Sequence, residues 1–527
     1  MTVTKCHLPP KPTKWLSHIP ILFLSLFSLT TNAAARTQRD DKDSTPSPSD
    51  LLTIQLPNTP IPLPLVGMGI GNLPHDLIPR VVHANLRPEF DIRLIDTAHA
   101  SRNERILGEA IASSYATAVD GVSAKRSTRG GDGAVSSPPP NENPSPPPAI
   151  HIVTKVWYTH LNYERTKLSI RESLTELQTA FSTTSNSHPD PRRIYVHMLL
   201  HWPRCDDSIP WMNCEEEENN LPLSVRELGT PPHLDKRHAW KDSWRAMEEA
   251  FEQYNVKRHG GESQRQPIIA SIGVSNFELD DMKELMAMAR VKPQVYQGNA
   301  WKVFHDPYLM DFLRENDVAF QAYGVMHGIL GRKNESPTAF GMLSSIAEEM
   351  REIVIRQSSG GTTDDWVEEE PISDEKKRRN PPPPVVTEAT VLLAYFVHSE
   401  IGIIPRASSS THQQENSPSS IAAILPHLTP SHVRRLEIAI PALMKGQDVH
   451  ASISFMNNLP GPIQVHWIHP ETEEEVLVST MVHAGAVEVM KTHPGHRFVA
   501  YDTERVVRRE FVVEVGYGER QHFHVEL

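Results

Sequence analysis

Short apolar segments that are typical of buried strands alternate with amphipathic, helix-like segments along most of the chain. IRLIDTA (92–98) precedes NERILGEAIASSYA (103–116), and HIVTKVW (151–157) precedes ERTKLSIRESLTELQTAF (164–181). The alternation continues through RIYVHMLLHW, IASIGVSNF, VAFQAYGV and the pair EATVLLAYFVHS and IGIIPRA. Repeated units of this kind build a parallel sheet with right-handed crossovers. Their number favours an α/β fold, a (β/α)8 TIM barrel, with functional residues at the C-terminal ends of the strands.

The pattern changes near residue 445. From VHASISFMNN to QHFHVEL, short alternating segments are separated by turn signals such as NNLPGP, HPETEEE and HPGH. This pattern is typical of a small all-β sandwich, which we expect over residues 445–527. A total of 527 residues is too long for one compact core, so the length also indicates at least two domains.

Three low-complexity segments interrupt the barrel pattern and are interpreted as insertions. They lie at about 121–149, 206–236 and 357–385; the second carries the acidic run Glu215–Glu218. Proline, of which the chain has 45 residues, gathers in such stretches, as is usual for linkers. We therefore expect the barrel to occupy residues 51–430, with these insertions in its loops.

The N-terminus has the pattern of a secretory signal. Basic residues precede an apolar run from Leu16 to Leu29, and the small residues Ala33–Ala35 follow. We expect a signal peptide over 1–35 and a disordered linker over 36–50, so that the chain enters the secretory pathway and is secreted or reaches an endomembrane compartment. An uncleaved anchor is the alternative. No later stretch is apolar and long enough to span a bilayer, so no stable span is expected after cleavage.

Charge and cysteine content limit the partners and the redox chemistry. The net charge is −13 and no long basic face is evident, so nucleic acid is not expected as a partner. Cys205 and Cys214 lie in one loop, where a disulfide bridge and two unpaired thiols are both possible, because spacing does not determine geometry. No metal site is expected.

The motifs at the strand ends resemble those of the aldo-keto reductases. LIDTAHASRNE (94–104) is similar to the family's signature Asp-Thr-Ala-x-x-Tyr-x-Asn-Glu, and PLPLVGMGIGN is similar to its opening hairpin and first strand. HIVTKVW, HMLLHWP, SIGVSNF, KPQVYQGN, QAYG and IIPR…QEN follow in the family's order. The resemblance covers most of residues 51–420. It implies hydride transfer between NADPH and the carbonyl or alcohol group of a small substrate.

The resemblance also implies the catalytic positions. Asp96, Lys155 and His201 match the family's aspartate, lysine and histidine, whereas Ser101 stands where the family has its proton-donating tyrosine. A serine hydroxyl is far less acidic than a phenol, whose pKa is about 10, and it lies closer to the backbone. A water molecule could bridge the gap. Tyr158 is a second candidate acid; the alternative is that it is an ordinary tyrosine of the barrel rim.

Asp96, Lys155 and His201 can also have purely structural roles. Asp96 and Lys155 can persist as a buried ion pair without catalysis, because loss of one partner strands the other charge at a cost of about 3–5 kcal/mol. His201 can equally be a hydrogen-bonded core histidine.

For the cofactor, the resemblance implies NADPH. Ser275, Asn276 and Gln297 match residues that bind the nicotinamide carboxamide, and Tyr323 matches the aromatic residue that stacks on the ring. At the adenosine end, Arg406 takes the place of a lysine near the 2′-phosphate, where it can still pair bidentately, while Glu415 and Asn416 match adenine contacts. The departures are Ala407 and His412 near the phosphate, Gly324–Met326 in place of Ser-Pro-Leu, and Gly71 in place of a tryptophan. Weakened NADPH binding is therefore expected.

The C-terminal segment resembles the β-domain of the von Hippel–Lindau tumour suppressor through NNLPGPIQVHWIHPETEEE and AGAVEVMKTHPGHRFVAYD. The resemblance implies a pocket for a hydroxyproline peptide at Trp467, Thr492, His496 and Phe498, two of which, Thr492 and Phe498, are substitutions. Trp467 and Phe498 can instead be core residues.

The sequence thus predicts an NADPH-dependent oxidoreductase with altered proton delivery. The alternative is a catalytically degenerate barrel that acts as a scaffold or nucleotide sensor, with the sandwich binding a protein or peptide.

Overall fold

The computed structural model describes seven stretches of the chain. They are residues 47–114, 149–181, 193–255, 266–358, 384–470, 472–513 and 521–526. The expected signal peptide and the first two-thirds of the expected linker lie outside these stretches, as do nearly all of the insertions expected at 121–149 and 357–385. None of the helices in the described stretches is both long enough and apolar enough to cross a membrane.

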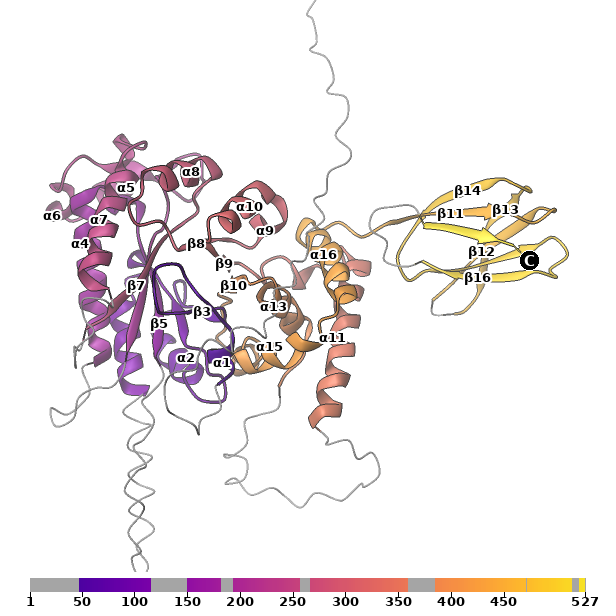
Figure 1. Cartoon of the computed structure of the whole chain (residues 1–527), viewed down its shortest axis with the longest axis horizontal. Coiled ribbons are helices and arrows are strands. Elements are labelled where there is room, and N and C mark those ends of the chain that lie inside the picture. The colour runs from indigo at the N-terminus through magenta and orange to yellow at the C-terminus, as the bar shows by residue number, and fades with distance from the viewer. Residues whose placement is uncertain are drawn as a thin grey trace, which may run out of the picture. The chain divides into compact units, whose positions relative to one another are not determined.

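Eight parallel strands form the central sheet, in the order in which they occur along the chain (Figure 1). They are β3 (Gly67–Gly69), β4 (Leu94–Asp96), β5 (Ile150–Val156), β6 (Ile194–Leu200), β7 (Ile268–Ser275), β8 (Val295–Asn299), β9 (Ala319–Tyr323) and β10 (Gly402–Ile403). The last strand returns to the first: Ile403 N–H donates to Leu65 O at 2.7 Å, and Gly69 N–H donates to Pro405 O at 3.0 Å. These bonds close the barrel, so the predicted fold class is confirmed. A short hairpin of β1 (Thr53–Ile54) and β2 (Leu63–Pro64) precedes it.

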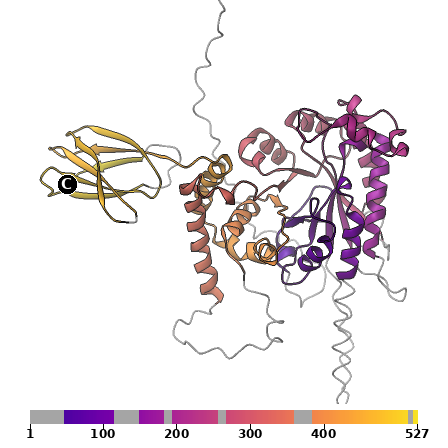
Figure 2. The same cartoon turned by 180° about the vertical axis from the view of Figure 1, so that it is seen from behind.

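Helices follow the strands and surround the sheet (Figure 2). The longer ones are α2 (Ile78–Asn85), a helix over residues 104–114, α4 (Tyr163–Leu177), α7 (Ala239–Tyr254), α8 (Leu279–Met288), α10 (Pro307–Glu315), α11 (Pro337–Ser358), α13 (Glu388–His398), α15 (Pro418–Ile424) and α16 (Pro430–Lys445). Local sequence determines several of their starts, because a polar side chain accepts a hydrogen bond from the first turn. Thr387 caps α13 and Thr429 caps α16 in this way.

Two boundaries differ from the expectations. Residues 47–50, placed in the disordered linker, belong to the structure: Ser47 and Asp50 form a capping box at the start of α1 (Pro48–Leu51). The helical part also continues past residue 430, because α16 runs to Lys445 and packs on α11. In that contact, His432 and Arg435 both bind Glu349, at 2.9 and 3.0 Å.

The segment at 206–236, which was interpreted as an insertion, is folded. It contains α5 (Cys214–Asn219) and α6 (Leu223–Arg226). Cys205 and Cys214 form a disulfide, which decides between the two alternatives. Glu218 of the acidic run is buried and makes a bidentate salt bridge with Arg165 of α4, at 2.8 and 2.9 Å. The acidic composition of the run suggests a fully solvated segment, but the Glu218 carboxylate has a buried partner 53 residues away in the sequence.

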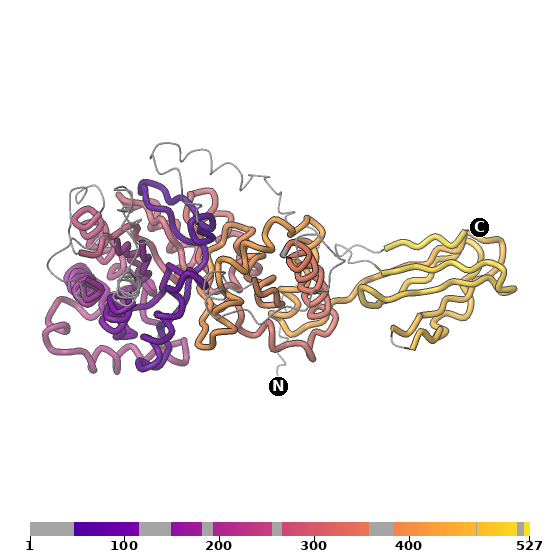
Figure 3. The backbone as a smooth tube through the Cα atoms, turned by 90° about the horizontal axis from the view of Figure 1, so that it is seen from below, coloured from indigo at the N-terminus to yellow at the C-terminus, as the bar shows by residue number. Residues whose placement is uncertain are grey.

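The C-terminal strands form two sheets (Figure 3). One is β14 (Val487–Thr492), β11 (Ala451–Asn457) and β17 (Gln521–Val525); the other is β13 (Glu475–Val482), β12 (Ile463–Ile468), β15 (Arg497–Asp502) and β16 (Arg508–Val512). All of these pairs are antiparallel except β11 with β17. Ile453, Phe455, Val465 and Phe498 are buried in a core of their own. The predicted all-β part is therefore present.

Candidate active site

A buried lysine–aspartate pair lies at the C-terminal ends of β4 and β5. Asp96 is the last residue of β4, and Lys155 is the sixth of seven residues in β5. Lys155 Nζ donates to Asp96 Oδ2 at 2.6 Å and to the carbonyl oxygen of Thr97 at 2.8 Å. The two side chains are only 4 % and 12 % exposed. An ammonium group has three N–H donors, so the third N–H of Lys155 is left for another acceptor.

His201 follows β6 and faces the same rim of the barrel. Its backbone N–H donates to Val156 O at 2.9 Å, and its ring packs edge-on against Trp157 at a centroid distance of 4.8 Å. Burial, and then the charge of Lys155, hold the pKa of His201 well below its ordinary value, so the imidazole is neutral. Its Nδ1 is buried and has no hydrogen-bond partner among the described residues.

Ser101 ends the short 3-10 helix η2 (His99–Ser101) at this rim. Gly71 lies beside it: a Cβ atom at Gly71 would be 3.3 Å from Ser101 Oγ, so a larger residue at position 71 would crowd the serine. Within the described stretches, no hydrogen bond joins Ser101 Oγ to Lys155. The geometry therefore does not support direct proton transfer between Ser101 and Lys155.

Tyr158 lies in η3 (Tyr158–His160), directly after β5, and differs from both interpretations made for it. It is 1 % exposed, which contradicts the ordinary rim tyrosine. Its hydroxyl donates to Glu217 Oε1, and Trp157 Nε1 donates to the other oxygen of the same carboxylate at 2.9 Å. Burial and the Glu217 carboxylate raise the pKa of Tyr158 far above its ordinary value. A phenol with a raised pKa is a poor acid, so the geometry disfavours Tyr158 as the proton donor.

Four side chains at the ends of β7, β8 and β9 form a cluster of two hydrogen-bonded groups, one around Asn276 and one around Gln297. Tyr323 hydroxyl donates to Asn276 Oδ1 at 2.7 Å, and Asn276 Nδ2 donates to Ser275 Oγ and to His201 O, each at 3.0 Å. Gln297 Nε2 donates to Asp96 Oδ2 and to Gln321 Oε1, each at 2.8 Å. Asn276 has a positive φ of 61°, which asparagine tolerates better than most residues. Gln297 is thus joined to Asp96, and Asn276 to the His201 backbone; the main-chain N–H of Asn276 donates to Gln297 O at 3.2 Å and links the two groups.

The unused hydrogen-bonding capacity of this cluster suits a carboxamide. Among the described residues, the bonds of Gln297 use its Nε2 and leave Oε1 as an acceptor. Ser275 Oγ accepts from Asn276, which leaves its own O–H to donate. One acceptor and one donor match the N–H and C=O groups of a primary amide. Burial raises the pKa of Tyr323 to about 12, so its ring stays neutral.

The residues predicted to bind the adenosine end of the cofactor differ in their exposure to solvent. Arg406 follows β10 and is exposed, whereas Ala407 beside it is buried. Glu415 ends α14 (Ser410–Glu415), and Asn416 is its buried C-cap. His412 of the same helix is exposed. The guanidinium of Arg406 is thus free to meet an anion, and the structure contains no hydroxyl at position 407 to assist it.

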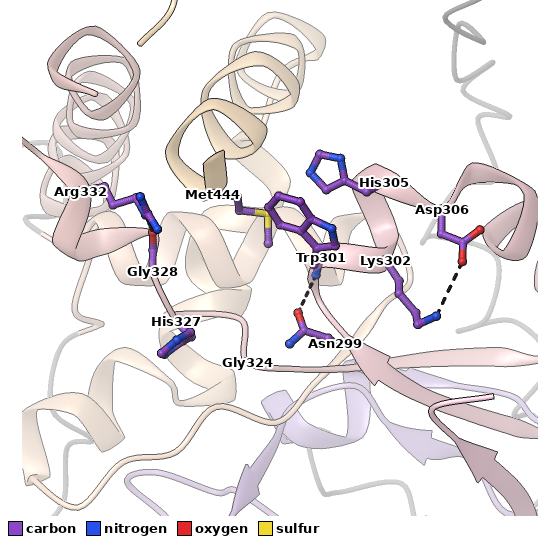
Figure 4. A pocket seen from close by; sticks show the side chains of 10 residues that line it. All are labelled: Asn299, Trp301, Lys302, His305, Asp306, Gly324, His327, Gly328, Arg332 and Met444. Carbon is purple, nitrogen blue, oxygen red and sulfur yellow. Dashed lines mark hydrogen bonds and ion pairs between the residues drawn. The ribbon is translucent and has the colours of Figure 1, made fainter. Parts of the chain in front are cut away.

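A pocket of about 580 Å³ lies beyond the C-terminal ends of β8 and β9 (Figure 4). Asn299 and Gly324, which line it, are two residues beyond Gln297 and one beyond Tyr323. The rest of its lining is Trp301, Lys302, His305, Asp306, His327, Gly328, Arg332 and Met444. Its two permanent cations already have carboxylate partners, since Lys302 lies 3.7 Å from Asp306 and Arg332 pairs with Glu335. The pocket therefore offers space next to the rim, without a strong local positive charge.

The sandwich brings together the residues predicted to bind a peptide. Thr492 Oγ1 and His496 Nδ1 are 2.8 Å apart, and the rings of Trp467 and His496 have centroids 5.2 Å apart. Trp467 lies opposite Phe498 in the β12–β15 pairing. Phe498 is 2 % exposed and packs on Phe455 in the core, in agreement with the core interpretation for that residue. Trp467 Nε1 is buried and has no hydrogen-bond partner in the described stretches.

Sequence reasoning missed several residues that complete these sites. Gln321 holds Gln297, and Glu217 holds Tyr158 and Trp157. Gln321 lies two residues before Tyr323 on β9, and its position on the inward face could have been read from strand alternation. Nothing in the sequence near Glu217 indicates its partners, which lie 59 and 60 residues away.

Comparison with known proteins identifies the family through its model. The model of the aldo/keto reductase family matches residues 76–438. An aldo-keto reductase of Mycobacterium tuberculosis is 23 % identical over 295 residues, which are 56 % of this chain and 73 % of that protein. The glycerol 2-dehydrogenase (NADP(+)) of Hypocrea jecorina is 28 % identical over 195 residues, 36 % of this chain and 48 % of that protein. A solved aldo/keto reductase from Brucella melitensis has a TM-score of 0.41 and 20 % identity, covering 75 % of this chain and 99 % of its own.

Proposed function

Because the chain belongs to the aldo/keto reductase family, whose members bind NADP(H), we propose that it is an NADPH-dependent oxidoreductase with altered proton delivery. Its substrate is a small carbonyl compound or the corresponding alcohol. The observation that carries this proposal is the continuous network from Lys155 through Asp96 to Gln297. It joins the residues that would meet the reacting oxygen to those that would hold the nicotinamide.

The amide cluster supports the choice of cofactor. Gln297 Oε1 and Ser275 O–H are positioned to bind a carboxamide, and the neutral ring of Tyr323 offers a stacking surface. NADPH, when bound, supplies the hydride. Arg406 would meet the 2′-phosphate alone, since position 407 is a buried alanine. We therefore expect weaker binding than a site with a full set of phosphate ligands would give.

Lys155 and His201 would act on the substrate oxygen. The third N–H of Lys155 can donate to a water molecule or to the developing alkoxide, and Asp96 holds the ammonium in place. The neutral imidazole of His201 can donate an N–H but carries no readily lost proton, so it orients the carbonyl. The proton itself would reach the alkoxide through water held between Lys155 and Ser101. General acid assistance contributes about 10²- to 10⁴-fold, so turnover without a tyrosine should be slow.

Binding of NADPH to the purified full chain tests the proposal. Tryptophan fluorescence and energy transfer to the nicotinamide should give saturable binding at about micromolar to millimolar concentrations. Gln297→Leu should abolish this signal, because it removes the acceptor for the carboxamide N–H. Gln464→Leu on β12 is the matched control and should bind as the parent chain does. Absence of binding at millimolar NADPH would contradict the proposal.

The second candidate function is that of a scaffold or nucleotide sensor whose sandwich binds a peptide. The cluster of Trp467, Thr492 and His496 favours it, since a buried indole N–H without a partner can donate to a ligand carbonyl. A hydroxyproline-containing peptide should bind the full chain and lose affinity in the double variant Trp467→Ala with His496→Ala. Binding that survives both substitutions would remove the peptide site from these residues.

A further inference from the structure

We propose that His99, His160 and Glu172 bind one divalent transition-metal ion, with zinc as the best match, on the wall of the barrel. The three residues come from η2, η3 and α4, which are separate in sequence. Their nitrogen and oxygen ligand atoms all lie within 4.8 Å of one another. His99 Nε2 is 2.9 Å from Glu172 Oε2, and the two histidine rings are in edge contact with centroids 4.8 Å apart. The sequence alone predicted no metal site.

The ligand types and distances suit zinc. Zinc binds imidazole nitrogen and carboxylate oxygen at about 2.0–2.2 Å, which places tetrahedral ligand atoms roughly 3.3 Å apart. The 2.9 Å separation of His99 and Glu172 is already close to that value. The other ligand atoms lie within 4.8 Å of one another, so the site needs a shift of up to one to two ångströms to reach that value. The partly exposed side chains of His99 and Glu172, 18 % and 46 % exposed, have room to move. Three protein ligands leave the fourth position for water.

The hydrogen bonding of His160 is compatible with a metal ligand. Its Nδ1 lies 3.0 Å from Thr159 Oγ1, and a hydroxyl can either donate to or accept from that nitrogen. If Nδ1 donates its N–H to the hydroxyl, Nε2 keeps its lone pair for an ion, and the Thr159 contact orients the ring as a neighbour of this kind does in known metal sites.

The surrounding charges permit a cation. The guanidinium of Arg165 is already matched by both carboxylate oxygens of Glu218. Glu172 contributes a formal negative charge to the grouping. The only other grouping of potential ligands found in the described stretches, Cys205 with Asp207 and Cys214, is not available, because its two sulfur atoms form the disulfide.

A metal ion at this site would connect three segments near the rim of the barrel. His99 is three residues after Asp96 and two before Ser101, while His160 is two after Tyr158. A bound ion would hold the loop that carries Ser101 against the segment after β5 and against α4. We therefore expect zinc to order this part of the rim and to stabilise the folded chain, because it binds the native arrangement and not the unfolded chain.

Zinc titration of the chelator-treated full chain by isothermal calorimetry tests the site. His99→Gln and Glu172→Gln are suitable variants, since both side chains are partly exposed and the changes preserve shape. Each should weaken binding by more than the roughly 10- to 100-fold that loss of an outer-shell partner costs. Glu164→Gln, an exposed carboxylate on the same helix, and His238→Gln, from a His238–Asp235 pair also 2.9 Å apart, are matched controls and should bind as the parent does.

Cobalt gives a second readout that does not depend on activity. Co²⁺ bound by two imidazoles and a carboxylate in a tetrahedral site should produce intense visible absorption, which zinc displaces and which Glu172→Gln abolishes. Circular dichroism of each variant checks that it is folded. Zinc affinity and cobalt absorption that are equal in the parent and in both ligand variants would overturn the proposal, since the ion would then be bound at other histidines of the chain.

Discussion

In the proposed reaction, the side chain at position 101 would limit proton delivery by its reach. A serine oxygen is one bond from Cβ, whereas a tyrosine oxygen lies beyond a whole ring, and proton transfer needs donor and acceptor about 3 Å apart. Gly71 lies beside this serine, since a Cβ atom added to the glycine would be 3.3 Å from Ser101 Oγ. The reaction would therefore rely on Lys155, Asp96 and His201, without a side-chain acid at position 101.

Restoring the phenol should restore the rate. Ser101→Tyr is expected to raise kcat for NADPH-dependent reduction of a model aldehyde by about 10²- to 10⁴-fold, the usual contribution of a general acid. Ser101→Phe adds the ring without the hydroxyl and should give no such gain. Equal kcat values for the two variants, with NADPH affinity unchanged, would show that the missing acid is not what limits turnover.

Tyr158 should matter for stability and not for catalysis, because its hydroxyl is engaged by Glu217 and its pKa is raised. Tyr158→Phe is expected to change kcat by less than about 10-fold, since general acids contribute more than that. It should lower the free energy of unfolding by about 1.5–3 kcal/mol, the worth of a hydrogen bond to a charged group. Tyr163→Phe, which loses an exposed bond to Glu249, is the control. Loss of turnover in Tyr158→Phe alone would restore Tyr158 as the acid.

At the scale of elements, the segment between β6 and α7 is held by buried polar contacts. Arg165 of α4 is fully buried and its guanidinium meets Glu218 of α5 as well as the carbonyl oxygens of Thr159 and Arg226. The disulfide from Cys205 to Cys214 closes the loop at the start of α5. These contacts place Glu217 against Tyr158, so a segment that looks like an insertion shapes the rim of the barrel.

Breaking the α4–α5 salt bridge should destabilise the chain strongly. Glu218→Gln is expected to lower the free energy of unfolding by about 3–5 kcal/mol, because it leaves the Arg165 charge buried without a partner. Urea titration followed by fluorescence measures this change. Glu215→Gln, an exposed residue of the same helix, should change stability by less than about 0.5 kcal/mol. A loss below 1 kcal/mol in Glu218→Gln would mean that water reaches Arg165.

For the molecule as a whole, several histidines are buried in the uncharged form inside the barrel. His151 of β5 and His197 of β6 are stacked and bonded, Nδ1 to Nε2, at 3.0 Å, and Ser271 Oγ lies 2.7 Å from His197 Nδ1. Burial lowers the pKa of His197 to about 3, and it holds the pKa of His151 well below its ordinary value. The unfolded chain therefore binds protons at these positions in a pH range where the folded chain does not.

The stability of the barrel should accordingly fall in acid. For a histidine with a lowered folded pKa, the contribution is complete above the unfolded value near 6.5 and is lost as the pH falls from there toward 3, at about 1.4 kcal/mol per pH unit for each residue. The free energy of unfolding, measured in urea between pH 7.5 and pH 5, should show this slope. His197→Asn should make the slope smaller by the contribution of one histidine. His238→Asn, at an exposed site, should leave it unchanged. A slope that is the same in His197→Asn would contradict this account.

The sequence by itself determined the barrel, the sandwich and the residue types at the strand ends, because hydrophobic periodicity and strand order are local properties that chain topology converts into shared edges. It also identified Asp96, Lys155 and Gln297 as site residues, and these three meet in the structure. Only the tertiary structure decided what each polar side chain bonds to. Glu217 binds Tyr158, Glu218 binds Arg165, and His99 meets Glu172 across 73 residues of sequence. The energy of a buried charge depends on its partner in space, and no local pattern encodes that partner.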